Sequence, residues 1–174
     1  PVGPNEIRVV DEEVCEVAPG TPGEIVMRGP LLVKEYWRDP QATAAAFRGG
    51  WFHTGDLARQ DAAGHFYFVD RKKDMVRRGG ENVSSQEVEA VLRAHPAVAD
   101  AAVVGVADPI WGEEIKACVV LRAGESAATL QPEQLRAFCA RRLAAFKVPR
   151  WIEYRDSLPR TATNRVRKDL LRSG

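Results

Sequence analysis

The sequence is poor in cysteine and histidine and contains no long hydrophobic run. Three of its 174 residues are cysteine and three are histidine, and no two cysteines form a C-x-x-C pair. This scarcity argues against a disulfide framework or a zinc site and favours a reducing, cytoplasmic location. The longest apolar stretch, residues 101–107, is far shorter than the roughly 18 residues of a membrane-spanning helix. We therefore expect no metal site and no membrane span.

An excess of charge of one sign is also missing. The 25 lysines and arginines nearly balance the 24 aspartates and glutamates, and the formal net charge is +1. Proteins that coat nucleic acid or bind membranes through charge usually have a larger excess, so we expect no nucleic-acid partner. Hydrophobic residues make up 45% of the chain and charged residues 28%, which is typical of a globular protein. The loop-like start at Pro1, without an initiator Met, leads us to expect a piece of a longer polypeptide.

The first seventy residues predict a β-rich region. A short helix is expected at 41–47, with Pro40 before it and a Gly-Gly stop after it. Turn-forming glycines and prolines separate the other segments. Strands are expected at residues 6–10, 24–28, 51–58 and 65–69, the last two joined as a hairpin.

The composition changes at residues 71–78, where five of eight residues are basic, and we place a domain boundary there. Beyond it, Ser84 and Glu87 fit a capping box at the start of a helix. The order of elements after the boundary favours a compact α+β module. These elements are strands at 98–106, 115–121 and 151–154, a helix at 131–146 and a last short helix at 166–171.

Four motifs occur together along the chain: WFHTGDL at 51–57, DRKKD at 70–74, GGENV at 79–83 and PRTAT at 159–163. In order and spacing they resemble the C-terminal motifs of the adenylate-forming superfamily, in particular its acyl-CoA ligases. The resemblance implies that residues 1–70 are the β-rich end of a large N-terminal domain. Residues 71–174 would then be an α+β lid with a small central sheet and a hinge near Lys73.

The resemblance implies that two residues lie near ATP and that a third is a hinge. Asp56 would accept hydrogen bonds from both ribose hydroxyls, which suits the two acceptor oxygens of a carboxylate. Arg71 would lie near the nucleotide, and Lys73 would be the hinge about which the lid turns between two catalytic poses. The plainer alternatives are a turn residue for Asp56 and a solvated basic face for Arg71 and Lys73.

Four further positions are implied to contact coenzyme A. The backbone of Gly79 and Gly80 would let the pantetheine arm pass close by, Trp111 would line its tunnel, and Phe146 would stack on adenine. A tight turn explains the glycines equally well, and packing explains the tryptophan. Phe146 also completes the apolar face of the expected helix at 131–146, which is the interpretation that we favour.

The sequence departs from the family pattern at Arg165. Relatives carry a glycine and then a lysine that bridges the acyl carboxylate and the α-phosphate, whereas this chain has Asn164 and Arg165. Asparagine tolerates the left-handed backbone conformation. Arginine keeps the charge but is broader and planar, so it either performs the role with altered geometry or lies in a basic surface loop.

The implied parent enzyme joins a carboxylic acid to coenzyme A, using ATP with Mg²⁺ and releasing AMP and pyrophosphate. The family's phosphate-binding loop is absent from this sequence, so we expect the chain alone to make no acyl-CoA and to need a missing N-terminal domain. A domain that loads a carrier protein and a noncatalytic basic binding module remain alternatives. The acyl substrate and the oligomeric state stay open.

Overall fold

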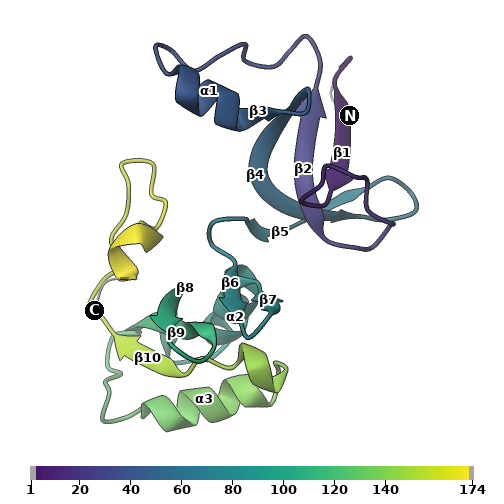
Figure 1. Cartoon of the computed structure of the whole chain (residues 1–174). Coiled ribbons are helices and arrows are strands. Elements are labelled where there is room, and N and C mark those ends of the chain that lie inside the picture. The colour runs from purple at the N-terminus through teal and green to yellow at the C-terminus, as the bar shows by residue number, and fades with distance from the viewer. Residues whose placement is uncertain (1–2, 173–174) are drawn as a thin grey trace. The chain divides into compact units, whose positions relative to one another are not determined.

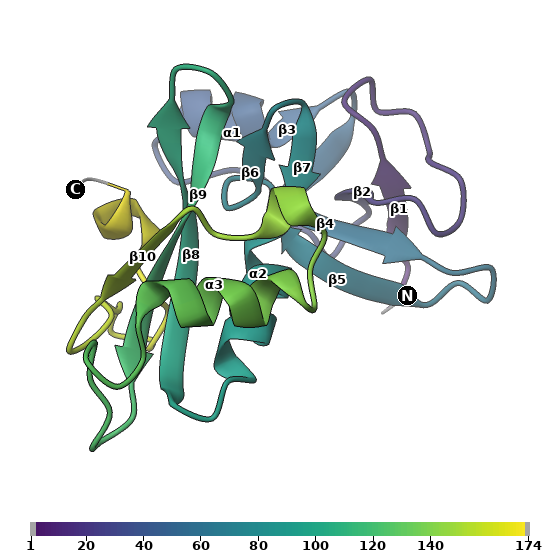
Figure 2. The same ribbon diagram turned by 90° about the horizontal axis from the view of Figure 1, so that it is seen from below.

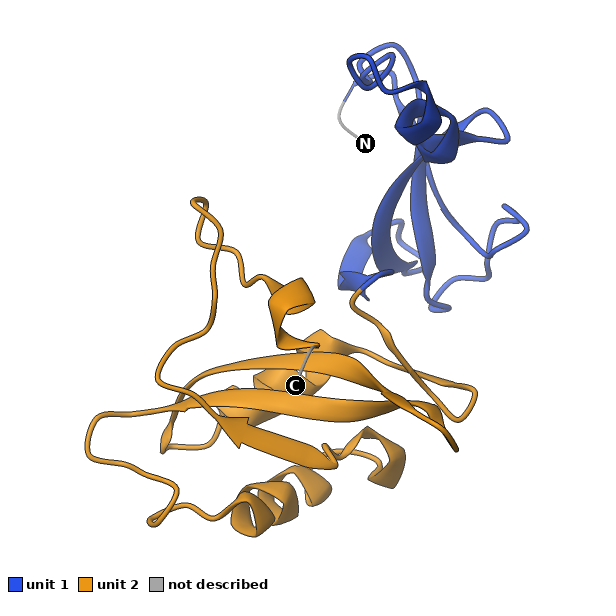
Figure 3. Cartoon of the chain, turned by 60° about the vertical axis from the view of Figure 1, so that its left-hand side comes forward, with its two compact units in different colours: residues 1–73 blue, residues 74–174 orange. Residues whose placement is uncertain are grey.

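The computed structural model describes residues 3–172, and the chain divides into two compact units between Lys73 and Asp74 (Figure 3). Each unit has its own sheet and its own buried cluster. No helix among the described residues is long and apolar enough to cross a membrane.

The first unit is a five-stranded antiparallel sheet with one short helix, α1 (Pro40–Ala46) (Figure 1). Its strands pair in the order β1-β2-β4-β3, and β5 pairs with β4. Val10, Val26 and Trp51 form its buried cluster. The strands are β1 (Glu6–Val10), β2 (Gly23–Arg28), β3 (Phe47–Arg48), β4 (Trp51–Gln60) and β5 (Phe66–Arg71).

Local side chains fix the ends of these elements. Asp39 caps α1, because its carboxylate accepts a hydrogen bond from the Ala42 amide at 2.8 Å. Asp61 closes the β4–β5 hairpin by accepting from the amides of Ala63 and His65, each at 2.9 Å. The strands predicted for this region are therefore present, and β4 and β5 form the expected hairpin.

The second unit is an α+β module, as predicted. Its central strand β9 (Gly112–Leu121) pairs with three neighbours: antiparallel with β8 (Val98–Asp108) and β6 (Val76–Arg78), and parallel with β10 (Trp151–Tyr154). The short strand β7 (Glu81–Val83) completes the sheet beside β6.

Helices α2 (Ser85–Arg93) and α3 (Pro132–Ala140) pack on one face of this sheet (Figure 2). Alternation along β8 decides which side chains they meet: Ala101 and Val103 join the helix-covered core, while Ala102 and Val104 lie on the opposite face. The C-terminal segment covers that second face with Leu158 and Leu171. Both faces of β8 are thus buried, which explains its continuous apolar sequence.

Two predicted helices are shorter in the structure. The helix expected at 131–146 ends at Ala140, and a 3₁₀ turn, η1 (Ala145–Lys147), follows. Ala144 is extended, with ψ 149°, and Pro149 disfavours helical backbone at the residue before it. The helix expected at 166–171 is the 3₁₀ helix η2 (Lys168–Leu171).

Candidate functional site

The first candidate region is the place where β4 and β5 face each other in the first unit. Asp56 of β4 pairs in register with Arg71 of β5, and Arg71 Nε lies 3.6 Å from Asp56 Oδ1. Both side chains are about 40% exposed. A cleft of about 550 Å³ opens here, and its lining residues are Thr54, Gly55, Asp56, Arg71, Lys72 and Lys73. The structure thus brings the predicted ribose carboxylate, the arginine and the hinge lysine into one cleft.

An irregularity in β4 presents Asp56 to this cleft. Gly55 has a φ of +73°, which favours glycine, and its carbonyl accepts a hydrogen bond from the Lys72 amide at 2.8 Å. The Thr54 hydroxyl donates to the Ile25 carbonyl at 2.7 Å and accepts from the Asp56 amide at 3.1 Å. The backbone of Asp56 is therefore fixed while its carboxylate stays accessible.

The buried Glu24 holds this part of the cleft in place through hydrogen bonds. Glu24 is 5% exposed. Its Oε1 accepts from the Gly55 amide at 3.1 Å, and its Oε2 lies 3.0 Å from Lys72 Nζ and 3.2 Å from His53 Nδ1. Burial raises the pKa of Glu24, but the hydrogen bonds from Lys72 and His53 outweigh that effect and lower the pKa below its ordinary value.

Sequence reasoning did not identify Glu24 as part of the site. The sequence does place the Glu24 carboxylate at the start of an otherwise apolar strand. A charged side chain in such a position is buried only when it has a partner, and this was the available signal. His53 contributes to this arrangement through the contact between its Nδ1 and Glu24, and its buried Nε2 has no hydrogen-bond partner among the described residues.

The second candidate region is the β6–β7 turn at Gly79 and Gly80. The Gly79 amide donates to the Trp111 carbonyl at 2.8 Å, and a Cβ added to Gly79 would lie 2.7 Å from Cε3 of the indole. Gly80 has open space around it. Both glycines have positive φ, +58° and +85°. Gly79 is therefore required by the turn and by the close tryptophan, whereas Gly80 is required by the turn alone.

The charges beside this turn are paired. Arg78 lies over the half-exposed Trp111 ring at 5.0 Å and pairs with the buried Glu114 at 2.8 Å. Asp108 accepts from the backbone amides of Trp111 and Ile110, and these hydrogen bonds lower the pKa of Asp108. Trp111 is thus held by its backbone on two sides while its ring remains accessible.

The third candidate region is the loop that carries Arg165. Thr161 and Arg165 close it, through a hydrogen bond from the Thr161 amide to the Arg165 carbonyl at 2.8 Å and one from the Arg165 amide to the Thr161 hydroxyl at 3.1 Å. Asn164 adopts the left-handed conformation, with φ +62°. Asparagine therefore provides the backbone geometry expected where relatives have glycine.

The Arg165 side chain is exposed. Its guanidinium makes no ion pair or hydrogen bond with any other residue in the described part of the chain. The ring of Phe146, in contrast, lies half-buried against the helix-covered core of the second unit. This position agrees with the packing role predicted for Phe146. Among residues 3–172, no group of three or more histidine, cysteine, aspartate or glutamate side chains is arranged to hold a metal ion.

Comparison with known proteins identifies the family. Residues 87–165 match the model of the AMP-binding enzyme C-terminal domain. The chain is 45% identical over 175 residues to a 2-succinylbenzoate–CoA ligase of Geobacillus kaustophilus, covering 99% of this chain and 34% of that relative. The chain contains the C-terminal domain of the AMP-binding, or adenylate-forming, enzymes. It spans about a third of the length of the curated relatives that it matches.

Two solved structures of this family have closely similar folds. ATP-bound MatB from Rhodopseudomonas palustris is 38% identical with a TM-score of 0.89, covering 97% of this chain and 33% of MatB. The o-succinylbenzoate CoA synthetase from Bacillus subtilis, in complex with its acyl-adenylate intermediate, is 37% identical with a TM-score of 0.87. The match covers 100% of this chain and 35% of the synthetase.

Proposed function

We propose that this chain is the C-terminal third of an ATP-dependent acyl-CoA ligase. The observation that carries the proposal is the cleft of the first unit, where the accessible Asp56 carboxylate faces Arg71 beside Lys73. A carboxylate with two accepting oxygens suits a vicinal diol such as the ribose of ATP. The relatives that resemble the chain over nearly its whole length are CoA ligases, which supports the same function.

In the first half-reaction, a carboxylate oxygen of the substrate attacks the α-phosphorus of ATP and pyrophosphate leaves, forming an acyl-adenylate. Asp56 would hold the ribose, Arg71 would lie near the nucleotide, and Mg²⁺ would accompany the phosphates. Negative charge accumulates where the two anionic groups meet, so a fixed cation lowers the barrier. We assign this role to Arg165, whose guanidinium has no partner among the described residues.

In the second half-reaction, the thiolate of coenzyme A attacks the acyl carbon, and AMP leaves as the thioester forms. The second unit would turn about Lys73 between the two steps. The pantetheine arm would pass the backbone at Gly79 and Gly80 beside the accessible ring of Trp111. Phe146, which is half-buried against the core of the second unit, would contribute mainly through packing.

A chimeric enzyme tests this function. Residues 1–174 would replace the matching third of the B. subtilis o-succinylbenzoate CoA synthetase, and formation of the o-succinylbenzoyl thioester would be measured. We expect activity from the chimera and none from the isolated chain or from the truncated synthetase. Thioester formation by the isolated chain, or a folded chimera that forms no acyl-adenylate, would contradict the proposal.

The same chimera separates the alternative acceptors. Transfer to a carrier protein in preference to coenzyme A would favour a carrier-loading adenylation domain. A noncatalytic basic module is disfavoured because four of the five cations between residues 160 and 172 are ion-paired. These cations and their partners are Arg160 with Asp100, Arg167 with Asp169, Lys168 with Glu89, and Arg172 with Asp74. A salt-sensitive gel shift of nucleic acid, unaffected by ATP or coenzyme A, would reverse that judgement.

A further inference from the structure

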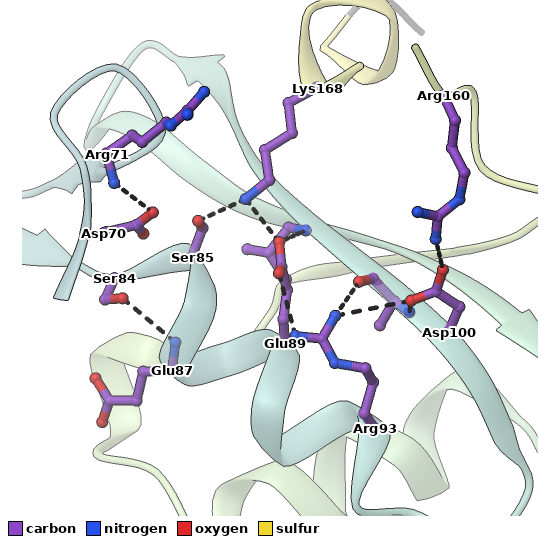
Figure 4. Close-up of polar contacts among 12 residues, drawn as sticks. Asp70, Arg71, Ser84, Ser85, Glu87, Glu89, Arg93, Asp100, Arg160 and Lys168 are labelled. Atoms are coloured by element: carbon purple, nitrogen blue, oxygen red, sulfur yellow. Dashed lines mark hydrogen bonds and ion pairs between the residues drawn. The ribbon is translucent and has the colours of Figure 1, made fainter. Parts of the chain in front are cut away.

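Two ion-paired anchors hold the ends of the loop at residues 160–168, which we call the Arg165 loop (Figure 4). One anchor joins Arg160 to Asp100, and the other joins Lys168 to Glu89. All four side chains belong to the second unit.

Arg160 uses both terminal nitrogens of its guanidinium. Nη1 donates to the carbonyl of Asn164 at 2.7 Å, next to Arg165, and Nη2 pairs with Oδ2 of Asp100 on β8. The planar fork of an arginine can make two such contacts in a fixed geometry. Arg160 therefore connects the loop next to Arg165 directly to the sheet.

Lys168 fixes the other end of the loop. Its Nζ lies 2.6 Å from Glu89 Oε1 and donates to the Ser85 hydroxyl at 2.6 Å. The side chains of Lys168 and Glu89 are only 12% and 7% exposed. Arg93 links this anchor to the first, because its Nη2 lies 3.4 Å from Glu89 Oε2 and its Nη1 lies 3.7 Å from Asp100 Oδ1.

The Arg165 loop is therefore anchored at both ends by ion pairs. Between the anchors lies Arg165, whose guanidinium has no partner among the described residues. A cation fixed in place before the reaction contributes more to the rate than one that must first be ordered. We propose that Asp100 is a positioning residue for Arg165 and acts through the bridge that Arg160 makes to the Asn164 carbonyl. The inference rests on the proposed function, because it takes Arg165 to act in adenylation.

Asp100→Asn is the most informative variant. The neutral amide weakens the pair with Arg160 but keeps an Oδ1 that can accept from the Ala101 amide, as it does now at 2.8 Å. Arg160→Lys keeps a positive charge for Asp100 but cannot also reach the Asn164 carbonyl through a planar fork. Glu133→Gln is the matched control, because it removes a surface ion pair with Arg136 on α3.

The assay compares two half-reactions in the chimera with o-succinylbenzoate. Adenylation is measured by exchange of pyrophosphate into ATP, and thioesterification is measured from synthetic acyl-adenylate and coenzyme A. We expect Asp100→Asn and Arg160→Lys to slow adenylation about 5- to 20-fold while thioesterification changes less than about twofold. Glu133→Gln should change neither rate. A purely structural role for Asp100 would lower both rates together and would overturn the proposal.

Arg165→Ala distinguishes the failure of this inference from that of the proposed function. If Arg165→Ala slows adenylation and Asp100→Asn does not, the positioning role is wrong and the function stands. If Arg165→Ala has no effect on adenylation, the positioning role of Asp100 and the assignment of Arg165 are both wrong, whereas a native chimera that forms no acyl-adenylate would contradict the proposed function itself. On the 174-residue chain itself, amide hydrogen exchange at Arg165 should become about tenfold faster in Asp100→Asn and stay unchanged in Glu133→Gln. Unchanged exchange in Asp100→Asn would also contradict the inference.

Discussion

Removing the Glu89 carboxylate should destabilise the second unit more than any surface substitution. This carboxylate is buried and accepts from three groups: Lys168 Nζ at 2.6 Å, the amide of Val103 at 2.9 Å, and Arg93 Nη2 at 3.4 Å. Glu89→Ala leaves the Lys168 ammonium, which is 12% exposed, without its carboxylate partner, although it still donates to the Ser85 hydroxyl. It also leaves the Val103 amide without this acceptor.

The expected loss in the free energy of unfolding is about 3–5 kcal/mol, the usual cost of breaking a buried ion pair from one side. About 1–3 kcal/mol of this loss belongs to the unsatisfied amide of Val103. The remainder belongs to the orphaned Lys168 charge. A double variant, Glu89→Leu with Lys168→Met, removes that charge and should lie only about 1–3 kcal/mol below the native chain.

Amide hydrogen exchange in β9 measures this stability within the whole chain, because the slowest amides exchange through global opening of their unit. The single variant should lose most of the protection of β9, and the double variant should recover part of it. If Glu89→Ala changed the unfolding free energy by less than about 1 kcal/mol, the Glu89–Lys168 pair would not have the importance that its burial implies. A double variant no more stable than the single one would refute the assignment of the loss to Lys168.

Three further outcomes follow from the geometry. In urea titrations, Gly79→Ala should destabilise the second unit by about 1 kcal/mol more than the matched control Gly80→Ala. Both substitutions strain a backbone with positive φ, but only Gly79→Ala also clashes with the indole of Trp111. Equal losses of stability in the two variants would count against that contact. A thiol reagent at pH 8 should modify only Cys15 in the native chain and all three cysteines after denaturation. Cys118 and Cys139 are buried, and the pKa of Cys139 is raised to about 11. Rapid modification of all three thiols in the native chain would contradict this expectation. The lowered pKa of Glu24 means that its stabilising effect is complete above its ordinary value of 4.5 and is lost as the pH falls below it. Glu24→Gln should therefore flatten the acid side of the stability profile of the first unit, and an unchanged profile would show that the ionised carboxylate is not the stabilising form.

The strands could be predicted because their signals are local. Alternation and turn residues located the four longer strands of the first unit, and apolar runs located the long pair β8 and β9. The strands β3, β6 and β7 were missed because each has only two or three residues, too few to show a period. The helix α3 was predicted too long because Phe146 continues the apolar spacing beyond Ala140, although the backbone has already left the helix.

In the candidate site, too, some residues could be predicted from the sequence and others could not. Asp56, Arg71 and Lys73 lie in recognisable motifs and share one cleft in the structure. The contacts that support this cleft and the Arg165 loop were not predictable, because Glu24 meets Lys72 across 48 positions of sequence and Ser85 meets Lys168 across 83. Such pairs have no period or spacing, and only the folded chain brings them together.

We propose that this chain supplies the lid of an adenylating ligase and that Arg165 provides the cation for the first half-reaction. The decisive measurement is pyrophosphate exchange by the chimera with native Arg165, Arg165→Lys and Arg165→Ala. Native and lysine forms should both exchange, and the alanine form should be slower by about 100- to 1,000-fold, with thioesterification from supplied acyl-adenylate retained. Exchange by Arg165→Ala at the native rate would contradict the account.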